Sequence, residues 1–78
     1  NPNYNDSIGQ LETLSRRGYF SLPTYKYKET HDEDGNPIWA CQCKVKEVDI
    51  VTNGRSSSKK DAKKQAAFDM LTYVLEEE

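Results

Sequence analysis

Four lysines fall within six residues at the start of a helical pattern, directly after a turn-forming pair and three serines. The run is Asn53-Gly54-Arg55-Ser56-Ser57-Ser58-Lys59-Lys60-Asp61-Ala62-Lys63-Lys64. Ser57 or Ser58 can cap the helix, because a serine hydroxyl accepts a hydrogen bond from a free N–H of the first turn. A lysine in that turn opposes the helix dipole and costs roughly 0.3–1 kcal/mol. Free N–H groups beside clustered ammonium groups predict an anion site, and several such contacts in a row if the anion is a phosphodiester backbone. The alternative is a lysine face that is merely solvated.

The positive charge of the chain is local. The 78 residues carry a net charge of −2, which is low for a protein that binds polyanions. By region, residues 1–27 carry +1, residues 28–43 carry −3, residues 44–64 carry +4 and residues 65–78 carry −4. Local potential matters more for binding than the total charge. The net charge therefore does not exclude a nucleic-acid partner.

A chain of 78 residues is expected to form one small domain with one core. It begins at Asn1 rather than Met, so we expect it to be part of a longer protein. No segment is long and apolar enough to span a membrane and no signal-peptide pattern is found, so no membrane partner is expected. Cys41 and Cys43, in a strand-like run, are interpreted as small buried hydrophobes in a reducing compartment, which predicts an intracellular protein, cytoplasmic or nuclear.

A short amphipathic helix is expected near the N-terminus. Residues 1–5 precede it and are expected to form a flexible lead-in. The helix should run from residue 6 or 7 to residue 16 or 17, with Gly18 as its C-cap. Its apolar stripe recurs at three-residue spacing: Ile8, Leu11 and Leu14.

Three strands are expected in the middle of the chain. Residues 24–29 and 38–46 alternate apolar or aromatic side chains with polar ones, so each strand has one buried face. The aromatic residues interpreted as core are Tyr25, Tyr27 and Trp39. A third strand near residues 49–52 should point Ile50 inward, and Asn53-Gly54 should end it.

The last helix should run from the serines to about residue 75, because small and apolar residues repeat at every fourth position. These are Ala62, Ala66, Met70 and Val74. The element order α-β-β-β-α predicts an α+β fold, a two-layer sandwich of a three-stranded antiparallel sheet with two helices on one face. The opposite sheet face should be left to solvent with Lys26, Lys28, Gln42 and Lys44. Residues 76–78 are expected to form an acidic tail.

The sequence contains no catalytic constellation. The single histidine, His31, lies in a loop beside three acids and has no nearby Ser or Cys nucleophile to serve. Residues 32–34 are all acidic but lack the spacing of a calcium-binding loop, so solvated loop acids are the better interpretation. We therefore expect no catalytic residue, metal, cofactor or small-molecule substrate, and the segment alone is not expected to be an enzyme.

Over residues 6–75 the sequence resembles the double-stranded RNA-binding domain (dsRBD) family. The most specific part is residues 58–67, which are similar to the family's helix start Lys-Lys-x-Ala-Lys-x-x-Ala-Ala. Pro23-Thr24-Tyr25 is similar to the family's Pro-x-Tyr at the first strand, and Trp39 stands where a core aromatic opens the second strand. The resemblance implies a dsRBD-like α-β-β-β-α fold that binds duplex RNA by shape, largely independently of sequence.

Members of the family span about 16 base pairs, touching two minor grooves and the major-groove phosphates between them. The resemblance implies that the lysines bridge the major groove and that the first helix lies in a minor groove. The family often has a Gln-Glu pair on that helix, and Glu12 and Thr13 stand at those positions here. Carried over by position, the expected RNA-binding residues are Lys59, Lys60, Lys63, Lys64, Ser58, Glu12, Thr13 and His31.

The acidic loop over residues 31–37 departs most from the family pattern. The family commonly carries Gly-Pro-x-His there, and its histidine inserts beside sugars and base edges. That position is Gly35 in this chain, and His31 lies four residues earlier, beside the three acids. Carboxylates repel a phosphate backbone unless the loop swings away or His31 turns inward. Compared with the family pattern, this loop therefore implies weaker RNA binding, or RNA binding made mainly through the two helices.

Two functions fit these observations. The first is a non-catalytic module that binds double-stranded RNA through phosphate and 2′-OH contacts and delivers it to another domain of a longer protein, such as a ribonuclease, helicase or deaminase. The second is the same fold used as a protein–protein or dimerisation module with weak or lost RNA binding. The acidic loop and tail favour the second, and the lysine helix opposes it. Its mark would be an exposed apolar face involving Tyr19, Phe20, Phe68 or Tyr73.

Overall fold

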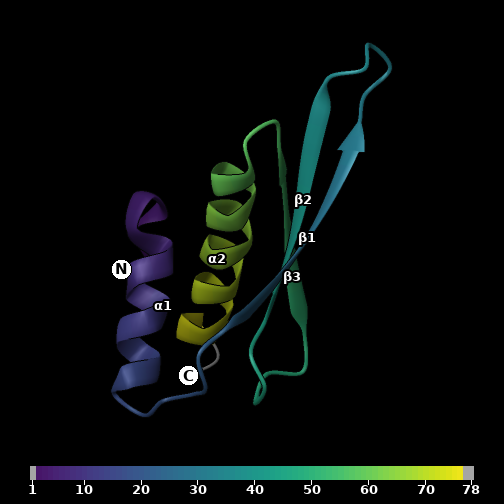
Figure 1. Cartoon of the computed structure of the whole chain (residues 1–78). Coiled ribbons are helices and arrows are strands. Elements are labelled where there is room, and N and C mark those ends of the chain that lie inside the picture. The colour runs from purple at the N-terminus through teal and green to yellow at the C-terminus, as the bar shows by residue number, and fades with distance from the viewer. Residues whose placement is uncertain (1, 77–78) are drawn as a thin grey trace.

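The computed structural model describes residues 2–76. After one short 3-10 turn the elements follow the order α-β-β-β-α, with these bounds: η1 Tyr4–Asp6, α1 Ser7–Arg16, β1 Thr24–His31, β2 Pro37–Lys44, β3 Val51–Ser56 and α2 Lys59–Glu76. The strands form one antiparallel sheet in the order β1-β2-β3, and both helices lie on one side of it (Figure 1). The predicted two-layer α+β fold is confirmed. Within residues 2–76, no helix combines the length and apolarity needed to cross a bilayer.

The first two strands form a long hairpin that projects beyond the helices (Figure 1). Their register runs without a break from Thr24 opposite Lys44 to His31 opposite Pro37. Asp32 closes the turn, since its backbone N–H donates to the Asn36 carbonyl at 2.9 Å. The hairpin is therefore longer than the sequence predicted, and the expected acidic loop shrinks to a tight turn at its tip.

The core lies between the sheet and α2. Small residues on the first turns of α2 let the helix approach the strands closely, and larger residues fill the space toward its end. The fully buried apolar residues are Leu11, Cys41, Cys43, Val45, Ala62, Ala66, Ala67, Met70 and Leu71. Both cysteines are unpaired and buried on the same face of β2, as predicted. Burial raises the pKa of Cys43 to about 11, so the thiol stays neutral at ordinary pH.

The third strand differs from its prediction. Asn53 and Gly54 lie inside β3 rather than ending it, and Ile50 is 37% exposed rather than buried. Thr52 takes the inward position, where its hydroxyl donates to the Ala66 carbonyl at 2.6 Å. A β-carbon added at Gly54 would meet the Ala62 carbonyl oxygen and lie 2.8 Å from the Ala66 nitrogen. Glycine is needed here for the close approach of α2 to the strand, not for a turn.

The N-terminal segment, which we expected to be a flexible lead-in, contains the start of η1 and contacts α2. Tyr4 begins η1, its ring packs edge-on against Phe68 at 5.3 Å, and its hydroxyl lies 3.3 Å from an Asp61 carboxylate oxygen. Aromatic packing against α2 thus holds Tyr4 in a segment whose composition is otherwise polar. Asn1 and residues 77–78 of the predicted lead-in and tail lie outside the described residues, and Glu76 is the last residue of α2.

Candidate nucleic-acid interface

The N-terminus of α2 is capped as the sequence predicted. The Asp61 backbone N–H donates to the Ser58 hydroxyl at 3.2 Å, and Ala62 N–H donates to the Ser58 carbonyl at 3.0 Å. Lys59 is therefore the first helical residue and follows the cap directly. The cap places Lys59 and Lys60 in the first turn of α2, where the helix dipole is positive and attracts anions.

Three of the four lysines of this helix start lie against aromatic rings. The ammonium of Lys59 is 4.5 Å from the centroid of the Tyr27 ring and 5.2 Å from that of Trp39. The ammonium of Lys63 is 4.6 Å from the Tyr25 ring, within the usual cation–π range. The ammonium of Lys64 is 6.0 Å from the Tyr4 ring, at the edge of that range. Lys60 has no ring contact among the described residues.

Two periodicities bring these groups together. Lys59 and Lys63 are four residues apart on α2 and share a helix face, and Tyr25 and Tyr27 are two residues apart on β1 and share a sheet face. Antiparallel pairing of β1 with β2 adds Trp39 beside them. The structure corrects the prediction that Tyr27 is a core residue, because it is 36% exposed.

The rings under the lysines are neutral. Burial raises the pKa of Tyr25 far above its usual value, with the adjacent Cys43 as a further cause, and burial also raises the pKa of Tyr27. Neither phenol ionises at ordinary pH, so the contacts are cation–π rather than ionic. The full charges of Lys59 and Lys63 remain available to an anion.

Asp61 is the one acid of this helix start. It accepts a hydrogen bond from the Gln65 amide at 3.1 Å, and Gln65 is the largest cause that lowers the pKa of Asp61; Ser56, Tyr4 and Lys64 lower it further. Its carboxylate is therefore held ionised at the positive end of the dipole, where it favours the helix. It points toward η1, so it does not pair with Lys59 or Lys63.

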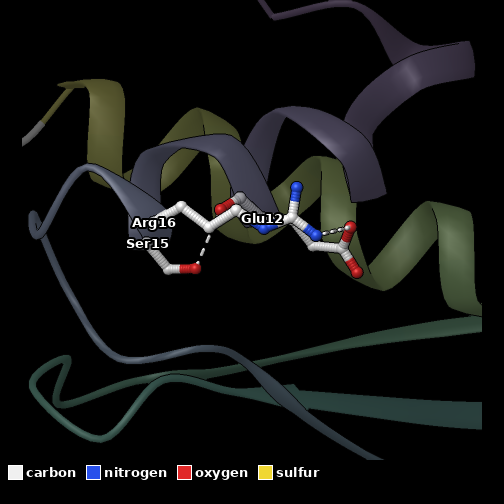
Figure 2. A network of polar contacts seen from close by, with 3 residues as sticks. All are labelled: Glu12, Ser15 and Arg16. Atoms are coloured by element: carbon white, nitrogen blue, oxygen red, sulfur yellow. Dashed lines mark hydrogen bonds and ion pairs between the residues drawn. The ribbon is translucent and has the colours of Figure 1, made fainter.

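On α1, Glu12 and Thr13 lie at the surface, and Thr13 is the more exposed. Figure 2 shows Glu12 reaching back to Arg16 along the helix, with a carboxylate–guanidinium distance of 3.8 Å. The Ser15 hydroxyl donates to the Glu12 carbonyl at 3.0 Å. An exposed ion pair of this kind contributes little stability, so the Glu12 carboxylate can exchange Arg16 for another donor.

His31 is exposed and ends β1, at the base of the hairpin tip. The Asp32 carboxylate accepts hydrogen bonds from the backbone N–H groups of Asp34 and Asn36, each at 2.9 Å. These bonds, with Asn36 as the largest cause, lower the pKa of Asp32. Within residues 2–76, no hydrogen bond, ion pair or ring contact joins His31 to the lysines of α2, although the hairpin tip and the start of α2 lie at the same end of the domain (Figure 1). Of the three loop acids, Asp32 thus stabilises the turn itself.

The residues that sequence reasoning missed are the aromatic supports of the lysines. Their signal was present, since the i,i+4 lysines and the i,i+2 tyrosines both have the periodicity of a single face. Their meeting depends on where α2 crosses the sheet, which periodicity does not specify. Among residues 2–76, no group of three His, Cys, Asp or Glu side chains is arranged to hold a metal ion.

Comparison with known proteins gives one family. Residues 7–74 match the family model of the double-stranded RNA binding motif. A Ribonuclease 3 of Roseburia hominis is 80% identical over 99% of this chain, and a Ribonuclease 3 of Treponema succinifaciens is 30% identical over 95% of it. The chain spans 22% and 20% of the length of these two relatives. The capped lysine helix, the element order and the family match agree: this chain belongs to the double-stranded RNA-binding domain family and is a binding module rather than a catalytic domain.

Proposed function

We propose that the start of α2 is the main RNA contact of this module, with Lys59, Lys60 and Lys63 on phosphates across the major groove. Lys64 and Ser58 support the same contact from its edge. The observation that carries the proposal is the seating of Lys59 and Lys63 on neutral rings, at 4.5 and 4.6 Å, beside a capped helix N-terminus. Ammonium groups and free N–H groups that face the same side attract successive phosphates.

We propose that α1 provides a second, 2′-OH-directed contact. Thr13 can donate to and accept from a 2′-hydroxyl, and the Glu12 carboxylate can accept from one once it releases Arg16. Contacts to phosphates do not distinguish RNA from DNA, whereas a contact to the 2′-hydroxyl does. The α1 contact therefore supplies the preference for RNA over DNA. His31 at the hairpin tip is a third contact site, weakened by the neighbouring carboxylates of Glu33 and Asp34.

We propose that the chain works as part of a longer ribonuclease. Both named relatives are called Ribonuclease 3, and the chain matches about a fifth of each. In such a protein the module holds the duplex while another domain cuts it. The unpaired, buried Cys41 and Cys43 support an intracellular setting, where thiols stay reduced.

The test is a titration of the 78-residue chain with a duplex RNA of about 20 base pairs and with the DNA duplex of the same sequence, each at two salt concentrations. Three or four phosphate contacts predict a log–log salt slope of about −3 to −4 by the duplex rule. Salt-sensitive binding to RNA and much weaker binding to DNA are expected. Equal affinity for both duplexes would contradict the 2′-OH contact, and no binding to either would contradict the proposal as a whole.

A second candidate function is docking of a protein partner at the opposite end of the domain. Tyr19 is 71% exposed and, with Phe20, Tyr73 and Val74, lines a hollow of about 350 Å³. Two hydrogen bonds from Ser21 to the Glu47 carboxylate, at 2.9 and 2.6 Å, hold the adjoining connection in place. Phe68 does not belong to this surface, because it packs against Tyr4.

The exposed Tyr19 favours the second candidate, which we propose as an additional role rather than a replacement for RNA binding. Sedimentation of the chain at rising concentration tests a dimer at this surface. Tyr19→Ser should abolish any self-association and leave RNA affinity unchanged. Self-association that survives this substitution would contradict the assignment.

A further inference from the structure

A second group of cations lies on the side of the sheet that faces away from the helices. Strand alternation places four basic side chains there, because the alternate residues of β2 and β3 are buried under α2. They are Lys26 and Lys28 of β1, Lys44 of β2 and Arg55 of β3. We call these four residues the outer face. All four are exposed.

The charge of the outer face is not balanced by acids. The one acid within the three strands is Glu29, which stands opposite Trp39 and therefore lies on the helix side. Among residues 2–76, no outer-face cation forms an ion pair. The outer face thus carries a local charge of +4 in a chain whose net charge is −2, against +3 for residues 59–64 at the start of α2. It is at least as positive as the surface that carries the proposed function.

The four cations surround a polar centre. Lys28 and Arg55 flank Ala40 in register, and Lys26 stands in the row of Gln42 and Asn53. The small side chain of Ala40 leaves an open hollow of about 250 Å³ in this part of the sheet. Neighbouring strands lie about 4.8 Å apart, so Lys28 and Arg55 stand roughly 10 Å apart on either side of Ala40. This spacing suits a polyanion with regularly spaced charges better than a single small anion.

The chemistry of this surface favours a nucleic-acid duplex. Side-chain amides and hydroxyls donate well to phosphate and sugar oxygens, and Gln42 and Asn53 supply two such amides. Proteins that hold single strands stack bases on aromatic rings. The aromatic residues of the strands, Tyr25, Tyr27 and Trp39, all lie on the helix side, so the outer face has no stacking platform within the described residues.

We infer that the outer face is a second surface for the phosphate backbone of duplex RNA, so that one chain holds two duplex segments on opposite sides of its sheet. This goes beyond the proposed contact of α2, which needs only one duplex. The second contact is weaker than the first, because its cations are not seated on rings and no helix N-terminus supports them. It depends more on long-range attraction and is lost first as salt rises.

The test is bridging of two duplexes, measured as energy transfer between a donor-labelled and an acceptor-labelled RNA duplex of about 16 base pairs at low salt. Two variants with the same charge change are compared: Lys26→Gln with Lys28→Gln on the outer face, and Lys59→Gln with Lys63→Gln on α2. Tyr19→Glu adds a negative charge on the helix side at the opposite end of the domain from the start of α2, and is the control away from both surfaces. Affinity for one duplex and bridging are measured separately.

We expect the unchanged chain and the Tyr19→Glu control to bridge when RNA is in excess and to stop when protein is in excess. The outer-face variant should keep its affinity for one duplex within about two-fold and lose bridging, because only the second surface is changed. Undiminished bridging by that variant, or none by the unchanged chain, overturns the inference. So does bridging by a protein dimer seen in sedimentation without RNA.

An acidic protein segment is the competing occupant. If a poly-glutamate peptide binds the unchanged chain and not the outer-face variant, while no bridging of duplexes occurs, the surface serves a protein and the inference is wrong. The variant of α2 separates this inference from the proposed function. Unchanged affinity of that variant for one duplex contradicts the proposed function, whereas the outer-face variant reports on the second surface alone.

Discussion

The ammonium of Lys59, on the first residue of α2, lies 4.5 Å from the centre of the Tyr27 ring on β1. A side chain that we propose as an RNA contact is thus positioned by a strand residue far away in sequence. The ring covers one side of the ammonium, and the exposed side keeps donors free for a phosphate. A lysine side chain carries about 2 kcal/mol of rotamer entropy, so a lysine already restricted by a ring loses less of it on binding.

Replacing Tyr27 with leucine should weaken RNA binding about two- to five-fold, since an exposed cation–π contact contributes about 0.5–1 kcal/mol. The salt slope should stay the same, because the number of phosphate contacts does not change. Tyr27→Phe is the matched control, since it keeps the ring and should bind like the unchanged chain. Fluorescence anisotropy with a labelled duplex measures both quantities. Equal affinities for the leucine and phenylalanine variants would show that Tyr27 does not position Lys59.

Replacing Lys59 and Lys63 together with alanine should leave the fold intact and lower RNA affinity by at least about 30-fold, because each charge-assisted contact contributes on the order of 1 kcal/mol or more. The salt slope should fall in magnitude by about two. Lys46→Glu changes the net charge by the same amount and should bind almost normally. Circular dichroism checks the fold. A folded double variant with unchanged affinity would refute the phosphate assignment.

Neutralising the hairpin tip with Glu33→Gln and Asp34→Asn should raise RNA affinity a few-fold at low salt, with the gain lost at high salt because screening removes the repulsion. Asp32 is left in place, since its carboxylate holds the turn through Asp34 and Asn36. Asp49→Asn with Asp69→Asn makes the same charge change away from the tip. If both pairs raise affinity equally, the effect is one of total charge and the hairpin does not approach the duplex.

Gly54→Ala should destabilise the domain by about 3 kcal/mol, because the new β-carbon collides with backbone atoms of α2 that cannot move aside independently. Asn53→Ala is the control, since Asn53 is exposed in the same strand and should change stability by less than about 0.5 kcal/mol. Urea unfolding followed by circular dichroism gives both values. A small effect of Gly54→Ala would mean that α2 can lift from β3 at little cost.

Stability should fall as pH rises from about 9 toward 11, because burial raises the pKa of Cys43 from its ordinary 9.0 to about 11. Above pH 9 the unfolded chain loses this proton while the folded chain retains it, so ionisation favours unfolding. The contribution is complete below pH 9 and is lost as pH passes the folded value. Urea unfolding between pH 8 and 10 measures the slope, which Cys43→Val should reduce. An equal slope in the variant would assign the effect to other groups.

The fold was predictable because its signals are local. Short-range chemistry accounts for the cap of α2 at Ser58, for Gly18 with its φ of +91° just after α1, and for the alternation along β2. All three agree with the element order. Gly54 shows the limit. Asn-Gly is a turn signal, but the close packing of α2 on β3 needs a glycine at the same position, and that packing is not local.

The candidate site was predictable in part. The resemblance and the charge pattern located the lysines, and the structure places them together at one helix end. The supports of Lys59 and Lys63 were not predicted, because Tyr25 and Tyr27 carry the same alternation as buried residues. Tyr4 was missed for the opposite reason: it stands alone in a polar segment, and only its contacts with Phe68 and Asp61 explain it.

The β1–β2 hairpin reaches well past the helices, into a region where the sheet has no second layer (Figure 1). A two-stranded ribbon without packing on either side is held mainly by its own backbone bonds, so it bends and opens more readily than the core. The domain therefore combines a well-packed helix, α2, with a more flexible hairpin arm. Such an arm can follow duplexes whose bulges or mismatches alter the distance between grooves, and hydrogen exchange should be fastest at its tip.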